Sequence, residues 1–493
     1  MAFLSVPLLA VLSVCCLAVY RFFIYPTFIS PLSKIPNAHW TAPFSPLWIL
    51  WTRYSSRENR VLHAAHLKLG PIVRVAPNEI SINDVAGLRT VYAGGFEKGE
   101  WYSIFDNYGV PCMFSEWHSR THSARKRMIS NTYSKSNIHN SAALAAQAQA
   151  ILYGRLLPAV DSADVKGIDV HDLWFATTMD GMTAYQFGLK NGSNFLQDVA
   201  YRRHWLDLYQ GRKGSTFFTQ ELPQFLKYCK KIGIKLVPKW VDDANQELED
   251  WTQMLCDNAM AYMKSSAATD KDVANDPVVL NALISGIGKE KKMKGEESVL
   301  ASTALKYERL SIASEMIDHV AAGHETSGIT LTYLSWQLSR DIPLQDKLRA
   351  ELLGLKPNML MSNSQPQIPS SKDLDALPLL HAVLMETLRL HAPIPGNEPR
   401  ITPYPSCTLG GYTVPGGVRV GAQAHSVHRN SEVYPDPETF DYTRWLDDEN
   451  GYSEEQRKER DRWFWAFSSG GRMCVGSNFA MHGENPLLPQ KLS

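Results

Sequence analysis

The chain of 493 residues has few cysteines, no excess of either charge and, after its first twenty residues, no apolar run long enough to span a membrane. Its seven cysteines are odd in number and show no repeated spacing, which is typical of a reducing compartment and argues against a disulfide framework. Lysine plus arginine and aspartate plus glutamate both number 50, so no net field draws the chain to nucleic acid. We therefore expect no nucleic-acid partner.

The membrane signal is the uncharged, apolar stretch at residues 2–20, which is just long enough to cross a bilayer. No basic residue precedes it, and Arg21 and several aromatic residues follow it, which favours an uncleaved anchor over a signal peptide. The charges of Arg21 and Lys34 favour a cytosolic location for the rest of the chain. Residues 1–24 are thus predicted to be a membrane anchor and the proline-rich residues 25–36 a stiff linker.

Residues 37–493 show no clear linker and no internal repeat, and they predict one large domain that is mainly α with small β-sheets. Helices are expected at residues 59–69, 115–135, 140–158, 244–264, 306–340, 343–355 and 377–390. Short strands are expected at residues 71–76, 79–82, 408–414 and 417–422. Two polar stretches, residues 289–297 and 356–372, are predicted to be exposed loops.

The most informative segment is a decapeptide near the end that matches F-x-x-G-x-R-x-C-x-G. Its fixed positions are Phe467, Gly470, Arg472, Cys474 and Gly476. An anionic cysteine sulfur is a strong electron donor and, as axial ligand of haem, favours cleavage of a bound O–O bond. The glycines would let the backbone approach the sulfur, and Arg472 suits a haem propionate. The motif predicts Cys474 as an iron ligand; the alternative is a buried free cysteine beside a glycine turn.

A second motif, Ala322-Gly323-His324-Glu325-Thr326, lies near the middle of the longest expected helix. A glycine there lowers helix stability by about 1 kcal/mol against alanine, and close approach of a flat cofactor is one reason for it. Thr326 can bond back to a carbonyl one turn earlier, and its hydroxyl and Glu325 are candidates for passing protons to bound dioxygen. The alternative is a packing notch with a surface glutamate. His324 is assigned to packing or solvent, not to metal.

A third motif places Glu386 and Arg389 three residues apart on an apolar helix, so that they face the same way and can pair. An exposed pair would contribute little to stability. The surrounding leucines instead indicate a partly buried network, with Arg444 as its candidate third member. Its role would be structural, as a lock on the loop that precedes Cys474.

These elements in this order resemble the cytochrome P-450 superfamily, the haem-thiolate monooxygenases, over nearly the whole chain. The resemblance implies the fold of that family, haem b as cofactor and Cys474 as its axial ligand. The family pattern A/G-G-x-D/E-T is matched by Ala322, Gly323, Glu325 and Thr326. Propionate contacts are implied for Arg400 and for the family's W/H-x-x-x-R, matched by His122 to Lys126 with lysine in place of arginine. Arg125 and Arg127 are alternatives to that lysine.

The resemblance also implies a reaction, the insertion of one oxygen atom of O2 into a hydrophobic organic substrate. Because no G-x-G-x-x-G follows a strand, NADPH and flavin are expected on a separate reductase in the same membrane, the endoplasmic reticulum, docked with help from Arg125, Lys126 and Arg127. The pocket is expected to include residues 95–114, 195–230 and 394–397. The chain is similar to fungal enzymes that tailor secondary metabolites such as polyketides or terpenes.

One departure from the family concerns the 19 residues after Cys474. The family continues with a long helix and then with strands that line the pocket, whereas Gly483, Pro486 and Pro489 are expected to stop a helix here after about two turns. The chain thus looks truncated, with haem cover and one pocket wall missing. Two alternatives stay open: a reductase-independent haem-thiolate isomerase or dehydratase, and a catalytically inactive membrane-bound protein.

Overall fold

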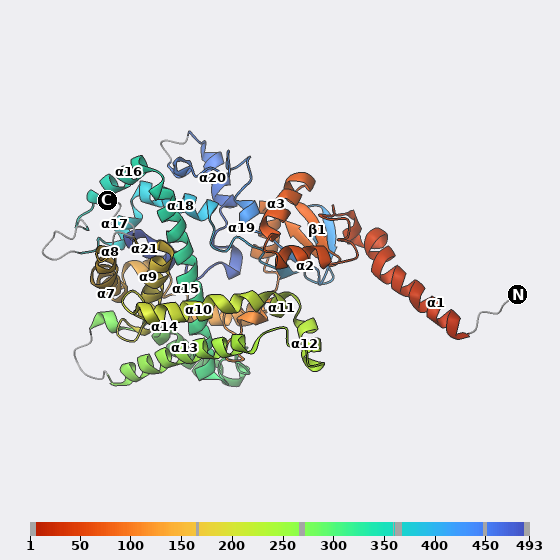
Figure 1. The fold of residues 1–493 in the computed structure, drawn as a ribbon, viewed down its shortest axis with the longest axis horizontal. Coiled ribbons are helices and arrows are strands. Elements are labelled where there is room, and N and C mark those ends of the chain that lie inside the picture. The colour runs from red at the N-terminus through yellow and green to blue at the C-terminus, as the bar shows by residue number, and fades with distance from the viewer. Residues whose placement is uncertain are drawn as a thin grey trace. The chain divides into compact units, whose positions relative to one another are not determined.

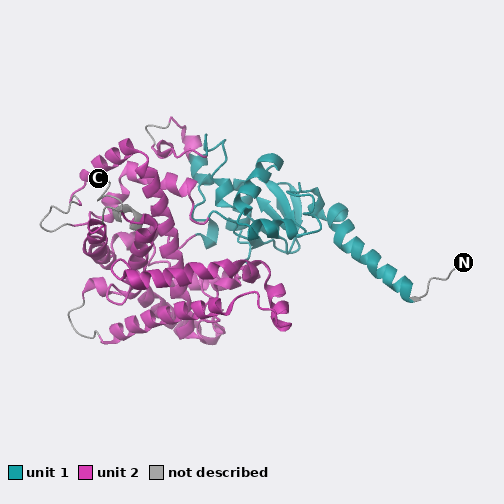
Figure 2. Ribbon diagram, viewed as in Figure 1, with its two compact units in different colours: residues 1–99, 395–437, 458–473 teal, residues 100–394, 438–457, 474–493 magenta. Residues whose placement is uncertain are grey.

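The structure, a computed structural model, describes residues 6–163, 167–265, 272–357, 359, 367–446 and 451–487. The chain divides into two compact units, which Figure 2 draws in different colours. Unit 1 comprises residues 1–99, 395–437 and 458–473, and unit 2 comprises residues 100–394, 438–457 and 474–493. Helices dominate and the sheets are small, as Figure 1 shows, which confirms the predicted fold class.

The N-terminal segment of unit 1 is α1 (Val6–Val19) followed by the π-helical turn η1 (Tyr20–Ile29). The helix from Pro7 to Ile29 is long and apolar enough to cross a membrane by length and composition. It therefore continues past Arg21 and through Pro26. The wider hydrogen-bond ring of a π-helix accommodates the missing N–H of Pro26, whose carbonyl oxygen accepts a 2.6 Å hydrogen bond from Nη1 of the buried Arg74.

A four-stranded sheet forms the centre of unit 1, in the order β1-β2-β6-β3. Its strands are β1 (Ile72–Ala76), β2 (Glu79–Ile82), β6 (Arg419–Gly421) and β3 (Arg400–Ile401). Strands β1 and β2 pair antiparallel, β2 and β6 pair parallel, and β3 joins β6 antiparallel with Arg400 opposite Val420. The predicted strands at residues 71–76, 79–82 and 417–422 are thus confirmed within two residues.

A separate hairpin corrects the prediction of one strand over residues 408–414. It consists of β4 (Ser406–Leu409) and β5 (Tyr412–Pro415), which pair antiparallel. Gly410 and Gly411 adopt φ angles of 53° and 81°, a left-handed conformation that glycine adopts without steric penalty, so the chain reverses there. The remaining helices of unit 1 are η2 (Pro31–Lys34), α2 (Leu47–Tyr54), α3 (Glu58–Leu69), α4 (Val85–Leu88), η3 (Arg89–Ala93), α19 (Ala424–Val427) and η10 (Gly470–Arg472).

Unit 2 is helical and is arranged around α15 (Glu308–Ser339) and α9 (Val170–Phe187). Its first helices are η4 (Glu100–Phe105), α5 (Ser119–Ile129), α6 (Lys135–His139), α7 (Ala142–Ile151), η5 (Leu152–Leu156), α8 (Leu157–Asp161), α10 (Val199–Gly211), η6 (Arg212–Ser215), α11 (Thr216–Glu221), α12 (Pro223–Lys231) and α13 (Lys239–Ser265). The later ones are η7 (Val273–Asn275), α14 (Val278–Lys294), η8 (Gly295–Glu297), α16 (Ile342–Leu353), α17 (Ser371–Asp375), α18 (Pro378–Leu390), η9 (Tyr442–Trp445) and α21 (Ser477–Leu487). A further helix, α20 (Glu454–Trp463), passes from unit 2 into unit 1.

Two glycines of α15 set how closely it packs on α9. A Cβ added at Gly323 would lie 2.6 Å from the Cγ and Sδ atoms of Met182, and one added at Gly328 would lie 2.6 Å from the ring of Phe175. Real Cβ atoms do not approach other atoms so closely, so a side chain at either position would require Met182 or Phe175 to shift. In this structure Gly323 therefore contributes to helix packing.

The predicted helix at residues 115–135 is shorter in the structure, where α5 covers Ser119–Ile129, and two further predictions need correction. The charged run at residues 289–297 is not a loop, because α14 continues to Lys294, where lysines in the last turn complement the helix dipole and Lys294 pairs with Glu290 at 3.0 Å. Helix α21 does not stop after two turns but extends through Gly483 to Leu487. Pro486 lies in its final turn. Pro489 lies outside the described residues.

Candidate active site

The side chain of Cys474 lies in unit 2, three residues before α21, and it is exposed and not part of a disulfide. Helix α5 of the same unit carries the buried His122 and the half-buried Lys126. Burial lowers the pKa of Lys126, and the charge of Cys474 acts in the opposite direction, so the sulfur lies within electrostatic range of the ammonium. An exposed sulfur beside a cation fits a haem, since the sulfur suits the iron and the ammonium suits a propionate.

The first part of the cysteine motif lies in unit 1, where Gly470 makes a turn that requires glycine. Its φ angle of 72° is left-handed, and an added Cβ would lie 2.3 Å from the carbonyl oxygen of Tyr92. Phe467 is half-buried in the same unit. At Gly476, in unit 2, an added Cβ would lie 4.0 Å from the sulfur of Cys474, which is ordinary contact. The sulfur itself therefore leaves room for a Cβ at Gly476.

The two arginines predicted to bind propionates both lie beside carboxylates of unit 1. Arg472 places Nη2 3.3 Å from Oε2 of Glu97, and Arg400 places Nη2 3.6 Å from Oε2 of Glu398. The guanidinium of Arg400 also lies 4.9 Å from the ring centroid of Tyr92. Each arginine is thus held in one orientation by an acid of its own unit, and a propionate contact for either remains a prediction.

Tyr92 is a supporting residue that the sequence analysis missed. It is buried, its hydroxyl donates to the carbonyl oxygen of Glu398 at 2.7 Å, and it accepts a 2.9 Å hydrogen bond from the backbone N–H of Ala422. The same residue blocks a side chain at Gly470 and stacks under Arg400. A single tyrosine outside any motif gives no sequence signal for such a role.

The Ala322–Thr326 motif lies on α15 in the middle of unit 2. The hydroxyl of Thr326 donates to the carbonyl oxygen of Ala322 at 2.7 Å, so the predicted bond back to the preceding turn is confirmed. Ala322 is exposed, and Thr326 lies one turn further along the same face. Small side chains on this face leave the helix backbone open to a flat ligand, whereas Gly323 faces Met182.

Glu325 points away from that face toward the segment that follows α10. Its carboxylate pairs with Lys213 and accepts a 2.8 Å hydrogen bond from the hydroxyl of Tyr209. Burial raises the pKa of Glu325, but the hydrogen bond and charge of Lys213, together with Tyr209, outweigh it and leave the pKa below its ordinary value. The carboxylate is therefore held as an anion, and a role in proton transfer requires it to leave Lys213.

His324 is fully buried against aromatic rings, as the assignment to packing predicted. Its ring lies edge-on to Phe175, Trp205 and Tyr209 with centroids 5.0–5.8 Å apart, and its Nδ1 is 2.7 Å from the carbonyl oxygen of Val320. Burial lowers the pKa of His324 to about 4, so the ring is neutral at physiological pH.

A buried network joins the Glu386–Arg389 pair of α18 to η9. Glu386 accepts from Nε and Nη2 of Arg389 at 2.8 and 2.7 Å, and both side chains are fully buried. Its carboxylate also accepts from the backbone N–H of Asp441 at 2.9 Å and from Nε1 of Trp445 at 3.0 Å, and it lies 3.5 Å from Nε of Arg444. Trp445 is thus a further member that sequence reasoning missed.

A family model described as cytochrome P-450 matches residues 42–492. The chain belongs to the cytochrome P-450 family. The family implies haem iron as cofactor, and it gives this cytochrome P-450 the activity of a monooxygenase, an oxidoreductase. The exposed Cys474, with Lys126 beside it, fits that cofactor.

Several relatives named cytochrome P-450 monooxygenase match most of this cytochrome P-450. Monooxygenase avaI of Aspergillus versicolor is 27% identical over 443 residues, which covers 85% of this chain and 94% of that protein. Monooxygenase aflV of Aspergillus parasiticus is 26% identical, over 91% of this chain and 82% of that protein. Monooxygenase stcB of Emericella nidulans is 25% identical, over 91% of this chain and 79% of that protein.

The first prediction concerns the buried carboxylate of Glu386. Replacing it with glutamine leaves Arg389 buried without its anion, so Glu386→Gln should lower unfolding stability by about 3–5 kcal/mol. The midpoint of chemical denaturation measures the loss. Glu459 provides a matched control, because it accepts from Arg462 and from Nε1 of Trp463 at 2.8 and 2.9 Å but lies at the surface. Equal effects of Glu386→Gln and Glu459→Gln would contradict the assignment.

The second prediction concerns the pKa of Glu325. In Lys213→Met the cation that lowers this pKa is gone and burial remains, so the pKa rises. A carboxyl with a depressed pKa stabilises the fold above its unfolded-state value, and this contribution is lost as pH falls through its folded-state pKa. The variant should therefore be less stable by about 1 kcal/mol at neutral pH, with the difference shrinking toward about pH 4.

Thermal unfolding followed against pH tests this expectation. Lys239→Met is the control, because Lys239 pairs with Asp243 only at the surface, at 3.2 Å, where such a pair is worth about 0.3–0.5 kcal/mol. A difference for Lys213→Met that does not change with pH would show that Lys213 contributes packing rather than charge.

Proposed function

We propose that this cytochrome P-450 oxidises a hydrophobic small molecule of secondary metabolism, a polyketide or a terpenoid, with haem b held by Cys474. The observation that carries the proposal is the exposed thiol of Cys474 in unit 2, at the ligand position of the family motif and beside Lys126. The names of the relatives from Aspergillus and Emericella support the reaction class. They do not by themselves specify a substrate.

Bound haem supplies the activation of dioxygen and its transfer to carbon. The chain's own residues would bind the haem iron, hold the haem in place and transfer protons. The sulfur of Cys474 would donate electron density to the metal, and Lys126, His122, Arg400 and Arg472 are the candidates for holding the propionates. Because Arg400 and Arg472 already lie near carboxylates, they are oriented before any ligand arrives.

Proton delivery falls to Thr326 and Glu325. The hydroxyl of Thr326 already donates to Ala322, which leaves its oxygen lone pairs to accept a proton donor or water on the open face of α15. Glu325 is anionic and tied to Lys213 and Tyr209. It serves as a proton carrier when its side chain rotates from Lys213 toward Thr326, which couples proton movement to the position of η6.

An aromatic cluster in unit 2 supports a hydrophobic substrate. Its members, Trp101, Tyr102, Phe105 and Phe114, have ring centroids 4.8–6.4 Å apart. Nε1 of Trp101 donates to Glu221 of α11 at 2.7 Å, which ties this cluster to the region of residues 195–230. Phe114 is partly exposed, so an apolar surface remains there for an organic ligand.

Electrons are proposed to come from NADPH through a separate flavoprotein reductase, with the helix from Pro7 to Ile29 anchoring the chain in the endoplasmic reticulum membrane. The predicted docking residues need one correction. Arg125 is buried, and its Nε donates to Glu116 at 2.9 Å, so it is not available for docking a partner. Arg127 is exposed on α5 and Lys126 is half-exposed, so these two remain candidates.

The third prediction tests the thiolate directly. The reduced full-length protein with carbon monoxide should show the Soret band of a thiolate-ligated haem, and Cys474→Ala should abolish it because no other sulfur takes this position. Cys407→Ala is the control, since Cys407 is a half-buried cysteine of the β4 strand, and it should keep the band. A wild-type protein without the band would support the inactive alternative, and a band in Cys474→Ala would assign the ligand elsewhere.

The fourth prediction tests Thr326. Thr326→Ala should keep haem binding but reduce product formed per NADPH consumed by roughly tenfold or more, because proton transfer loses its positioned hydroxyl. Thr332→Ala is matched, since Thr332 makes the same kind of bond, 2.7 Å to the carbonyl oxygen of Gly328, further along α15. Unchanged coupling in Thr326→Ala removes this residue from the mechanism. Turnover without NADPH would favour the reductase-independent isomerase.

A further inference from the structure

A cluster of three ligating side chains lies on α15, one to two turns before the Ala322–Thr326 motif. Glu315, Asp318 and His319 are spaced so that they share one helix face, and their oxygen and nitrogen atoms lie within 4.8 Å of one another. Nε2 of His319 is 3.4 Å from Oε1 of Glu315. We propose that this cluster binds a divalent transition-metal cation, with zinc as the first candidate.

Two buried atoms of the cluster lack hydrogen-bond partners. Glu315 is 1% exposed and His319 is 5% exposed, yet neither Oε1 of Glu315 nor Nε2 of His319 has a hydrogen-bond partner among the described residues. A buried carboxylate oxygen without a donor is strongly unfavourable, because it has lost its hydration and gained nothing in return. A cation between these two atoms satisfies both lone pairs at once.

The other polar atom of each side chain is already held. Oε2 of Glu315 accepts a 2.9 Å hydrogen bond from the backbone N–H of Met113, and Nδ1 of His319 is 2.8 Å from the hydroxyl of the buried Tyr133. Metal-binding histidines characteristically make such a second hydrogen bond, which fixes the ring and leaves the remaining nitrogen as the ligand. Oε1 and Nε2 are thus the atoms left to bind metal.

The local charge also favours a divalent cation. The guanidinium of Arg125 is shared by two carboxylates, with its Nε 2.9 Å from Glu116 and its Nη1 3.9 Å from Glu315. Asp318 brings a further carboxylate into the cluster. Unbalanced negative charge in a mostly buried site is unfavourable, and one divalent cation removes it.

The ligand set and its spacing point to zinc. One imidazole nitrogen with two carboxylate oxygens is a set that Zn²⁺ accepts, at metal-to-ligand distances near 2.1 Å. In tetrahedral coordination that distance places neighbouring ligand atoms about 3.4 Å apart. The observed separation of Nε2 and Oε1 is 3.4 Å, so these two atoms need little movement to share an ion. A water molecule would take the fourth position.

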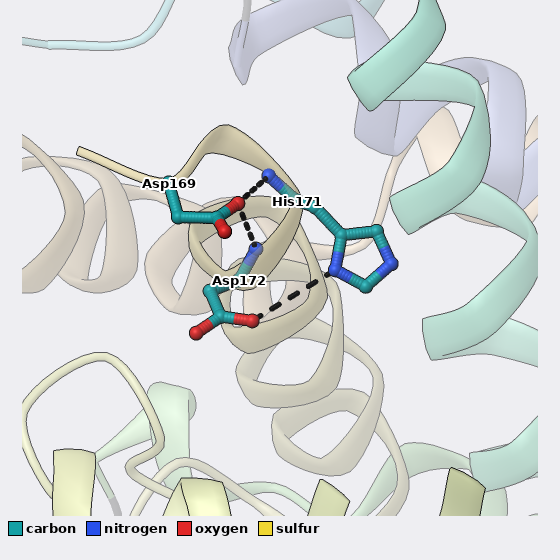
Figure 3. Close-up of side chains that lie close together, drawn as sticks. All are labelled: Asp169, His171 and Asp172. Atoms are coloured by element: carbon teal, nitrogen blue, oxygen red, sulfur yellow. Dashed lines mark hydrogen bonds and ion pairs between the residues drawn. The ribbon is translucent and has the colours of Figure 1, made fainter.

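A second cluster of carboxylates and a histidine, Asp169, His171 and Asp172, is drawn in Figure 3 and caps a helix. Oδ1 of Asp169 accepts from the backbone N–H groups of His171 and Asp172 at 2.9 and 3.3 Å, at the start of α9. Nδ1 of His171 lies 3.8 Å from Oδ1 of Asp172, and Asp169 and His171 are exposed. Its oxygen atoms serve the helix N-terminus and water, so it supplies a matched control rather than a site.

The fifth prediction is tested by stripping the full-length protein with a chelator and titrating it with zinc in competition with a chromogenic chelator. The wild type should bind one zinc per chain through this cluster. Glu315→Gln and His319→Gln should lower the affinity by at least about 100-fold, and Tyr133→Phe, which alters only the support of His319, by about 10–100-fold. Asp172→Asn should change nothing.

The same titration on Cys474→Ala identifies zinc that is bound by the exposed thiol. The proposal requires the high-affinity zinc binding to persist in this variant. Circular dichroism establishes whether each variant is folded. If Glu315→Gln or His319→Gln does not fold, Tyr133→Phe still tests the site, because it leaves the ligands in place. The proposal is overturned if the wild type binds no zinc, if the zinc is lost in Cys474→Ala, or if Asp172→Asn weakens binding while folded Glu315→Gln or Tyr133→Phe does not.

Discussion

The close contact between α9 and α15 fixes the rotation of α15 about its axis, and the chemistry of unit 2 depends on that rotation. Gly323 and Gly328 lie against Met182 and Phe175, where any Cβ would overlap them. A helix turns by about 100° per residue, so fixing one face fixes all of them. Ala322 and Thr326 are thereby left on an open face, while Glu325 is directed to Lys213 and Tyr209. The prediction for Lys213→Met depends on this geometry.

The sequence predicts the bounds of these helices better than it predicts the contacts between them. The bounds of α15 and α18 are correct within two residues, because long amphipathic periodicity and motif spacing are local properties. Helix α9 was not predicted, since fourteen of its eighteen residues are buried and no polar face marks its period. Lys213 is more than a hundred positions from Glu325, and only the fold brings them together. The packing role of Gly323 likewise depends on its contact with Met182 of α9, which is distant in the sequence.

Burial decides what a short motif means, and two glutamates of this chain show it. Glu386 and Glu459 each precede an arginine by three residues and each accept from a tryptophan Nε1. The sequence patterns are nearly the same. Glu386 and Arg389 are both fully buried, so removing one charge leaves the other buried without an ion-pair partner or water. Glu459 and Arg462 are exposed, so water hydrates the charge that remains when the other is removed. The E-x-x-R spacing could be read from the sequence, but the number of donors around Glu386 could not.

The two charged groups of α15 act independently, because the helix holds them apart. Glu315 and Glu325 are ten residues apart, which corresponds to about 15 Å along a helix axis. At physiological ionic strength, interactions between charges beyond about 8–10 Å are largely screened where solvent intervenes. Glu325 pairs with Lys213, whereas Glu315 shares the guanidinium of Arg125 with Glu116. A cation at Glu315 therefore relieves a local imbalance and leaves the carboxylate at Glu325 as it is, so the two sites can be tested separately.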